Sequence, residues 1–138
     1  MTNRIRIPLG IAALLITLAA GGYYQYNKPA LQVSEAAAEP VSADALLTAF
    51  HDNEPEANKQ YLNKVLQVTG NVADIQEAGD HNLQVLLDAN DPMSTIACTI
   101  EEGKRKPAAG QKVTVKGICT GYLNDVILIK CILVNTEK

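Results

Sequence analysis

The chain opens with a long apolar run that is set apart from the rest of the sequence. No charged side chain occurs from Ile7 to Asn27, and this run meets the length of about 20 residues that spans a bilayer. Arg4 and Arg6 precede it and favour a cytoplasmic N-terminus by the positive-inside rule. The pattern predicts a single-pass membrane anchor over residues 1–28, with the remaining chain across the membrane.

A cleaved signal peptide has the same basic start and apolar centre, so it stays open as an alternative. Ala20-Gly21-Gly22 offers small residues near a cleavage position. The tyrosines at positions 23, 24 and 26 suit the interface of a membrane, which favours an anchor that is not cleaved. Both alternatives export the rest of the chain, either membrane-bound or as a soluble form.

Residues 29–41 lack periodicity and are rich in Ala, Glu and Pro, which predicts a linker. A single domain is expected over residues 42–138, a length that fits one modest core. Ser42 is a suitable N-cap for a helix that begins at Ala43 and extends to about Asn63. Apolar residues lie on one face of this helix, and Asn53-Glu54-Pro55 predicts a break within it.

After the helix the apolar period changes to alternation, which is typical of β-strands. Turn signals separate five predicted strands, over Val65–Ala73, Leu83–Leu87, Thr95–Ile100, Lys112–Thr120 and Val126–Val134. One helix and five short strands predict a mainly β fold, a small barrel whose interior is filled by side chains. The N-terminal transmembrane helix is expected in addition to this domain.

Charge argues against a nucleic-acid partner. The 138-residue chain has a net charge of −3. Arg4 and Arg6 are the only charges before Lys28, so the exported part carries −5. Nucleic-acid-binding domains usually carry a basic face. The one basic cluster, Lys104-Arg105-Lys106, is largely offset by the neighbouring Glu101 and Glu102.

Several motifs taken together resemble the tRNA_anti-like family, OB-fold bacterial proteins of which many are membrane-anchored and of unknown function. The first is Ala43-x-x-Leu46-x-x-x-Phe50-x-x-Asn53-Glu54-x-x-Ala57-x-x-x-Tyr61-x-x-Lys64, followed by Val68-Thr69-Gly70-x-Val72. The second is Val115-Lys116-Gly117-Ile118-Cys119-Thr120-Gly121-x-x-x-Asp125-Val126-x-Leu128-x-x-Cys131. The end of the apolar run, Tyr24-x-Tyr26-Asn27-Lys28-Pro29, resembles that of membrane-bound members.

The resemblance covers nearly the whole chain and implies a five-stranded OB-fold barrel. It carries over no catalytic or ligand-binding residue. Many OB folds have a helix between their third and fourth strands, but Glu101–Gln111 is short and rich in helix breakers. The helix before the first strand is therefore expected to cap the barrel, which leaves less room for a ligand at that end.

The three cysteines, Cys98, Cys119 and Cys131, could form one disulfide in an exported domain. The OB topology places the third and fifth strands side by side, and Cys98 and Cys131 both fall on predicted inward faces. The geometry of a disulfide therefore favours a Cys98–Cys131 bridge. A Cys119–Cys131 bridge and three free thiols remain alternatives.

The sequence predicts no enzyme, metal or cofactor site. His51 and His81 lie in separate elements, whereas a zinc site needs three or four clustered ligands. Asp88 and Asp91 fit turn chemistry better than a calcium loop. Phe50 and Tyr61 are expected in the core, together with the apolar helix face. Tyr122 follows the fourth strand in a turn and is the one predicted surface contact for a ligand.

These inferences combine into a predicted function. The protein is expected to be a membrane-tethered, extracytoplasmic OB-fold module that binds a protein or another envelope component and catalyses no reaction. The alternative is an OB domain that binds an oligonucleotide or an oligosaccharide.

Overall fold

The computed structural model describes residues 6–26, 32–101 and 105–137. It divides into two compact units, Met1–Gln32 and Val33–Lys138. The first contains a 21-residue helix, α1 (Arg6–Tyr26). Within the part of the chain that the structure describes, no helix has both the length and the apolar character needed to cross a membrane. The predicted transmembrane helix is therefore not confirmed.

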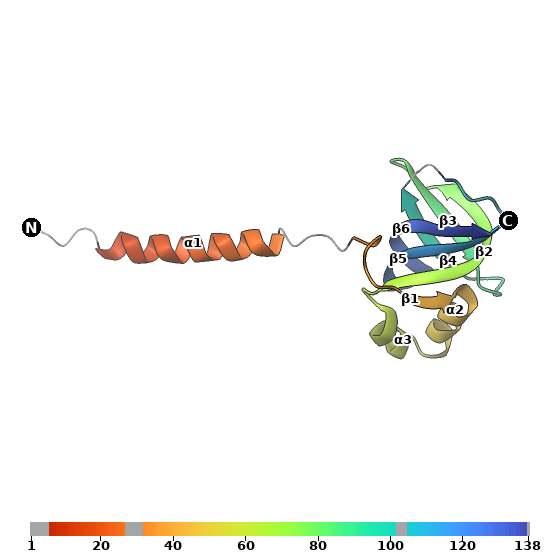
Figure 1. Cartoon of the computed structure of the whole chain (residues 1–138). Helices are drawn as coiled ribbons and strands as arrows, with labels where there is room; N and C mark the ends of the chain where they lie inside the picture. The colour runs from red at the N-terminus through yellow and green to blue at the C-terminus, as the bar shows by residue number, and fades with distance from the viewer. Residues whose placement is uncertain (1–5, 27–31, 102–104, 138) are drawn as a thin grey trace, which may run out of the picture. The chain divides into compact units, whose positions relative to one another are not determined.

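The second unit is a closed barrel, as Figure 1 shows. Its strands are β2 (Val65–Glu77), β3 (Asn82–Asp88), β4 (Thr95–Glu101), β5 (Lys112–Tyr122) and β6 (Val126–Glu137). They lie in the order β2-β3-β4-β6-β5, and β5 pairs back with β2 to close the barrel. Only the β4–β6 pair within this ring is parallel. This is the predicted OB topology, and each of the five predicted strands is present and somewhat longer than expected.

A sixth strand, β1 (Glu39–Ser42), was missed by the sequence analysis. It pairs in parallel with β2, and Val41 lies opposite Val68. The segment before it also packs on the domain, because Val33 is buried and Nζ of Lys116 donates to the carbonyl of Ser34 at 3.4 Å. The predicted linker over residues 29–41 is therefore wrong for residues 33–41, which belong to the domain. Its first residues, 29–31, lie outside the described part of the chain.

The predicted helix is divided in two, α2 (Ala43–Asp52) and α3 (Glu54–Tyr61). Oγ of Ser42 accepts the backbone N–H of Ala45 at 3.4 Å and so caps α2. Asn53 ends α2 and caps α3, because its Oδ1 accepts the N–H of Glu56 at 3.3 Å. The predicted N-cap and the predicted break are both confirmed.

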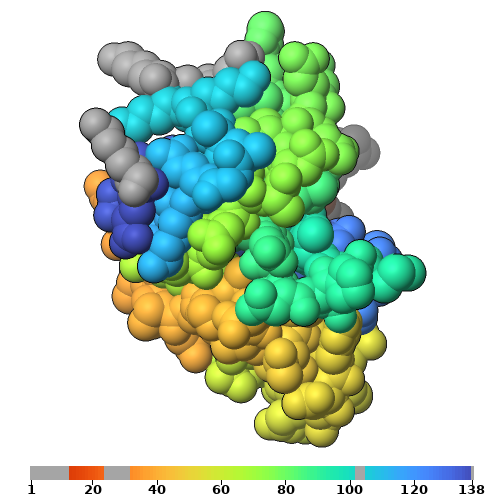
Figure 2. Space-filling view, turned by 90° about the vertical axis from the view of Figure 1, so that its right-hand side faces the viewer, coloured from red at the N-terminus to blue at the C-terminus, as the bar shows by residue number. Residues whose placement is uncertain are grey.

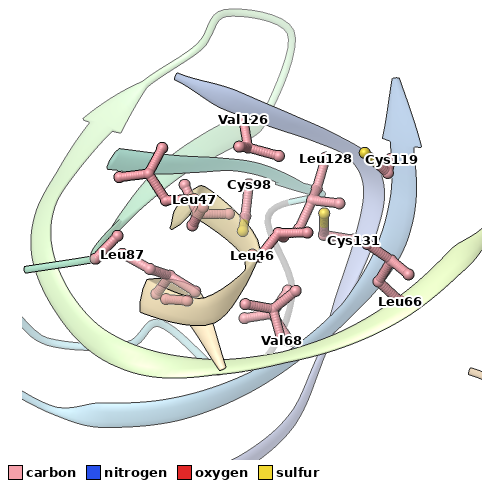
Figure 3. Close-up of a cluster of buried hydrophobic side chains, with 14 of the residues drawn as sticks. Leu46, Leu47, Leu66, Val68, Leu87, Cys98, Cys119, Val126, Leu128 and Cys131 are labelled. Carbon is pink, nitrogen blue, oxygen red and sulfur yellow. The ribbon is translucent and has the colours of Figure 1, made fainter. Parts of the chain in front are cut away.

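Helix α2 covers one end of the barrel and fills it, as expected from its place before the barrel strands. Its residues Leu46, Leu47 and Phe50 are at most 2% exposed, and Figure 3 shows Leu46 and Leu47 pointing in among the strands. Burial of each such side chain contributes roughly 1.5–3 kcal/mol. The helix can approach because β2 has Gly70 beneath it, where a Cβ would lie 2.9 Å from Cβ of Ala43.

Strand β6 contains a bulge that sets the direction of its later side chains. In the β4–β6 pair, Cys98 lies opposite Leu128 but Ile100 lies opposite Cys131, so β6 has one extra residue. Lys130 in this bulge has a positive φ of 51°. The bulge brings Cys131 to the same inward face as Leu128, and both are buried.

Candidate functional site at one end of the barrel

Tyr122, the ligand contact predicted from the sequence, lies at the end of β5 and is half-buried against α2. Its ring stacks on Phe50 with the two centroids 5.9 Å apart and the planes at 26°. Its hydroxyl oxygen is 3.0 Å from Nε2 of His51, a residue 71 positions away in the sequence. The fold therefore joins the last turn of α2 to the end of β5 through a stacked ring and a hydrogen bond.

The loop between β3 and β4, residues 89–94, reaches the same end of the helix. Oδ2 of Asp91 lies 3.9 Å from Nδ1 of His51. Oδ1 of Asp91 accepts two backbone N–H groups of its own turn, including that of Met93 at 2.7 Å. Asp88 accepts the N–H of Asn90 in the same way, at 2.9 Å. The predicted turn role of both aspartates is confirmed.

Further hydrogen bonds join this loop to the turn between β5 and β6, residues 123–125. Nδ2 of Asn124 donates to the carbonyl of Met93 at 3.2 Å. Oδ1 of Asp125 accepts both the N–H and the hydroxyl of Thr95, at 2.7 and 3.0 Å. Two of these three bonds join a side chain to a backbone atom and the third joins two side chains, and together they hold the β5–β6 turn against the β3–β4 loop and the start of β4.

The two joined loops expose large apolar side chains. Met93 is 78% exposed and Leu123 is 82% exposed. Figure 2 shows the loop between β3 and β4 projecting above the helices, with the turn between β5 and β6 beside it. We call this region the barrel-end surface. It consists of six residues from the end of α2, the β3–β4 loop, the end of β5 and the following turn: His51, Asp52, Asp91, Met93, Tyr122 and Leu123.

Sequence reasoning identified only Tyr122 among these residues. From the sequence, His51 is considered only as a metal ligand, whereas in the structure it bonds to Tyr122. Leu123 lies within a predicted turn, residues 121–125, and Met93 directly follows another, residues 88–92, so neither is a predicted site residue. One sequence signal could have found them. Met93 and Leu123 are large apolar residues among turn-forming Asp, Asn and Pro, and a large apolar residue rarely helps to form a turn.

The cysteines occupy the interior of the barrel as three free, buried thiols. The predicted Cys98–Cys131 disulfide is not shown, because both cysteines are free. A hydrogen bond with the Cys131 side chain, followed by burial, raises the pKa of Cys98 well above its usual value. Burial also raises the pKa of Cys119. Figure 3 shows Cys98 and Cys131 pointing inward near Leu46, with Cys119 to one side.

The end of β3 away from the barrel-end surface carries His81. This residue lies in the turn between β2 and β3 and lines a shallow hollow of about 240 Å³ together with Glu77 and Asp80. His51 and His81 therefore lie at opposite ends of β3. No group of three or more metal-ligating side chains occurs among the described residues. The basic cluster Lys104-Arg105-Lys106 falls partly outside them.

The outer face of β3 and β4 is the surface on which OB folds bind oligonucleotides and oligosaccharides. On this face the two strands form four cross-strand pairs, in which Ala97 is buried and the other residues are at least partly exposed: Asn82 with Glu101, Gln84 with Thr99, Leu86 with Ala97, and Asp88 with Thr95. The two charged members are both acidic. A phosphate backbone is bound through Lys and Arg, and none of these eight residues is a Lys or an Arg.

Comparison with known proteins agrees with this topology. The sequence matches the tRNA_anti-like family over residues 1–133. The chain belongs to the tRNA_anti-like family. A search of curated proteins found no match.

Among solved structures, the tRNA_anti-like chain is similar to a "putative nucleic acid-binding lipoprotein" from Klebsiella pneumoniae subsp. pneumoniae. The two share 20% sequence identity, with a TM-score of 0.54. The similarity covers 78% of this chain and 100% of the other. At this level of identity the similarity establishes a common fold.

Proposed function

We propose that this tRNA_anti-like protein is an exported, membrane-tethered accessory module that binds another protein through its barrel-end surface and catalyses no reaction. The observation that carries the proposal is the exposure of Met93 and Leu123 on two loops that hydrogen bonds hold together. Large apolar side chains on a rigid support are the usual centre of a protein interface, because little conformational freedom is lost on binding.

The polar groups beneath these side chains support binding in preference to catalysis. Oδ1 of Asp91 is already engaged by the backbone of its turn, and Oδ2 lies 3.9 Å from His51, beyond hydrogen-bonding distance. Nε2 of His51 is engaged by the hydroxyl of Tyr122. The bond between His51 and Tyr122 fastens α2 to the end of β5, so Nε2 of His51 is engaged within the protein, whereas a general base would direct this atom at a substrate.

The proposed export rests on the uncharged run from Ile7 to Asn27 and on Arg4 and Arg6 before it. A phosphatase fused after the last strand is expected to be active only if the domain is exported. Cell fractionation and the intact mass of the mature chain then distinguish a tether from a cleaved signal. An inactive fusion with a folded domain would contradict the proposed location.

Crosslinking in intact cells tests the proposed protein binding. A Met93→Asp/Leu123→Asp variant places charges in the centre of the surface and is expected to lose the adducts of the unchanged protein. Val134→Asp is the matched control, since Val134 is 45% exposed on the barrel wall. Retention of every adduct by the double variant would contradict a partner at the barrel end.

A second candidate, an oligonucleotide-binding OB domain, is favoured by the description of the Klebsiella lipoprotein. Fluorescence anisotropy with a labelled single strand tests it at low and moderate salt. Affinity for a nucleic acid falls steeply with salt because bound counterions are released. We expect no anisotropy change, since the outer face of β3 and β4 carries Asp88 and Glu101. Salt-sensitive binding would favour this second candidate.

A further inference from the structure

We infer that the partner segment that docks on the barrel-end surface is basic as well as apolar. This inference rests on the proposed protein binding and adds the chemistry of the partner to it. It follows from the distribution of charge around Met93 and Leu123, which differs from that of the chain as a whole.

Every full charge in the segments that build this end is negative. Residues 43–53, 88–95 and 122–126 contain five aspartates and no lysine or arginine. Asp44 lies at the far end of α2, and Asp125 is engaged by Thr95. The remaining three, Asp52, Asp88 and Asp91, lie at least partly in solvent, at the end of α2 and in or next to the loop that carries Met93.

The surface combines an apolar centre with an acidic rim. Met93 has a flexible, polarisable side chain that adapts to different apolar contacts, and Leu123 beside it is almost fully exposed. Complementary charge around such a centre guides association and excludes partners of the same sign. A segment in which Lys or Arg alternates with apolar side chains fits both features.

The same charges argue against the two other classes of occupant. Anionic lipid headgroups and nucleic acids carry phosphate and attract basic proteins. Asp52, Asp88 and Asp91 would face these phosphates with charge of the same sign. An anionic lipid surface and an oligonucleotide are therefore disfavoured at this end of the barrel, and each becomes an outcome of the test.

Because the loops are held in place before the partner arrives, a short partner segment is sufficient for binding. Asn124 bonds to the loop of Met93, and Asp125 bonds to Thr95. The surface therefore need not be ordered when the partner binds, which removes part of the entropic cost of association. A partner segment of modest length can then bind specifically.

A residue-specific crosslink in the full-length protein tests the inference. A benzophenone amino acid replaces Leu123, cells are irradiated, and the attached peptide is sequenced by mass spectrometry. We expect the crosslinked peptide to be rich in Lys or Arg and in apolar residues. The same benzophenone group in place of Val134 is the control for non-specific labelling.

Charge reversal provides the second arm. Asp52→Lys places a cation in the last turn of α2, where the helix dipole favours it, so folding is expected to be retained. The yield of the Leu123 adduct should fall about fivefold, as expected for the reversal of one rim charge. Glu77→Lys makes the matched change at the opposite end of the barrel and should leave the yield unchanged.

The outcomes separate the inference from the proposed function. A crosslinked peptide that is acidic or neutral, or a yield unaffected by Asp52→Lys, would overturn the basic partner but leave protein binding in place. Adducts only to lipid or to nucleic acid would overturn both. The absence of any protein adduct specific to position 123 would overturn the proposed function itself.

Discussion

The interior of the barrel and the barrel-end surface are built from the same strands, yet different interactions hold them. The interior is apolar and closely packed, with Leu46 at 0% exposure against the strands. The barrel end depends on aspartate and asparagine side chains that bond to backbone groups, while its apolar residues face solvent. Stability and binding are therefore assigned to separate sets of residues, which mutations can test independently.

The largest expected effect is that of Phe50→Ala, at the boundary of the two regions. Phe50 is 1% exposed and contacts both Tyr61 and Tyr122. Loss of its ring should lower the free energy of unfolding by about 3–5 kcal/mol. Urea denaturation measures this loss, with Leu62→Ala at a 37% exposed position as the control. A loss below 1 kcal/mol would mean that α2 contributes little to the barrel.

Gly117→Ala should have the next largest effect, within the interior. A Cβ at this position would collide with Sγ of Cys131, which lies across the β5–β6 pair. Overpacking of this kind costs about 1–3 kcal/mol. The combination Gly117→Ala/Cys131→Ala removes the colliding sulfur and should recover much of the stability. A double variant no more stable than the single one would show that the collision is not the cause.

Asp125→Ala tests the hydrogen bonds that hold the loops of the barrel end together. The variant loses two hydrogen bonds to Thr95, which should cost about 1–2 kcal/mol. Hydrogen exchange should accelerate first in residues 89–95, while the protection of β2 and β5 stays nearly unchanged. Uniform acceleration throughout the barrel would show that the two regions are not separable.

Tyr122→Phe should give a smaller effect at the same end. The variant keeps the ring that stacks on Phe50 but loses the hydroxyl group bonded to His51. We expect a loss of about 0.5–1.5 kcal/mol in the free energy of unfolding. His51→Ala with and without Tyr122→Phe completes a double-mutant cycle. Additive losses in that cycle would deny a direct interaction between the two side chains.

The smallest effect near neutral pH concerns the buried thiols. The folded state raises the pKa of Cys98 and of Cys119. The two protonated thiols therefore make their full contribution to the free energy of unfolding at any pH below the pKa of a thiol in the unfolded chain. It is lost as the pH rises through the higher pKa values of the folded state. Unfolding measured from pH 8 to pH 10 should show decreasing stability, and Cys98→Ala/Cys119→Ala should show a weaker decrease. An equal decrease in both would assign it to other groups.

Most of the fold could be predicted from local patterns. The alternation after Val65 predicted all five barrel strands, and Ser42 and Asn53 marked the helix boundaries. Strand β1 was missed because it has four residues, includes Pro40 and depends on pairing with β2. No property of those four residues alone distinguishes a short strand from a linker.

The candidate site was less predictable because its parts meet only in the folded chain. His51, Asp91 and Tyr122 come from a helix, a loop and a strand, and no spacing in the sequence relates them. The cysteines show the opposite case. The inward faces predicted for Cys98 and Cys131 are confirmed, but a shared face did not imply a disulfide.

The pairing of β6 has a consequence for how the protein folds. This last strand is held between β4 and β5, and β5 in turn closes on β2. The barrel therefore cannot close before the final strand is available, and its contacts join distant parts of the chain, which slows folding. Under the proposed export, the polypeptide would remain unfolded long enough to be threaded through a translocation channel, and closure by β6 would follow on the far side.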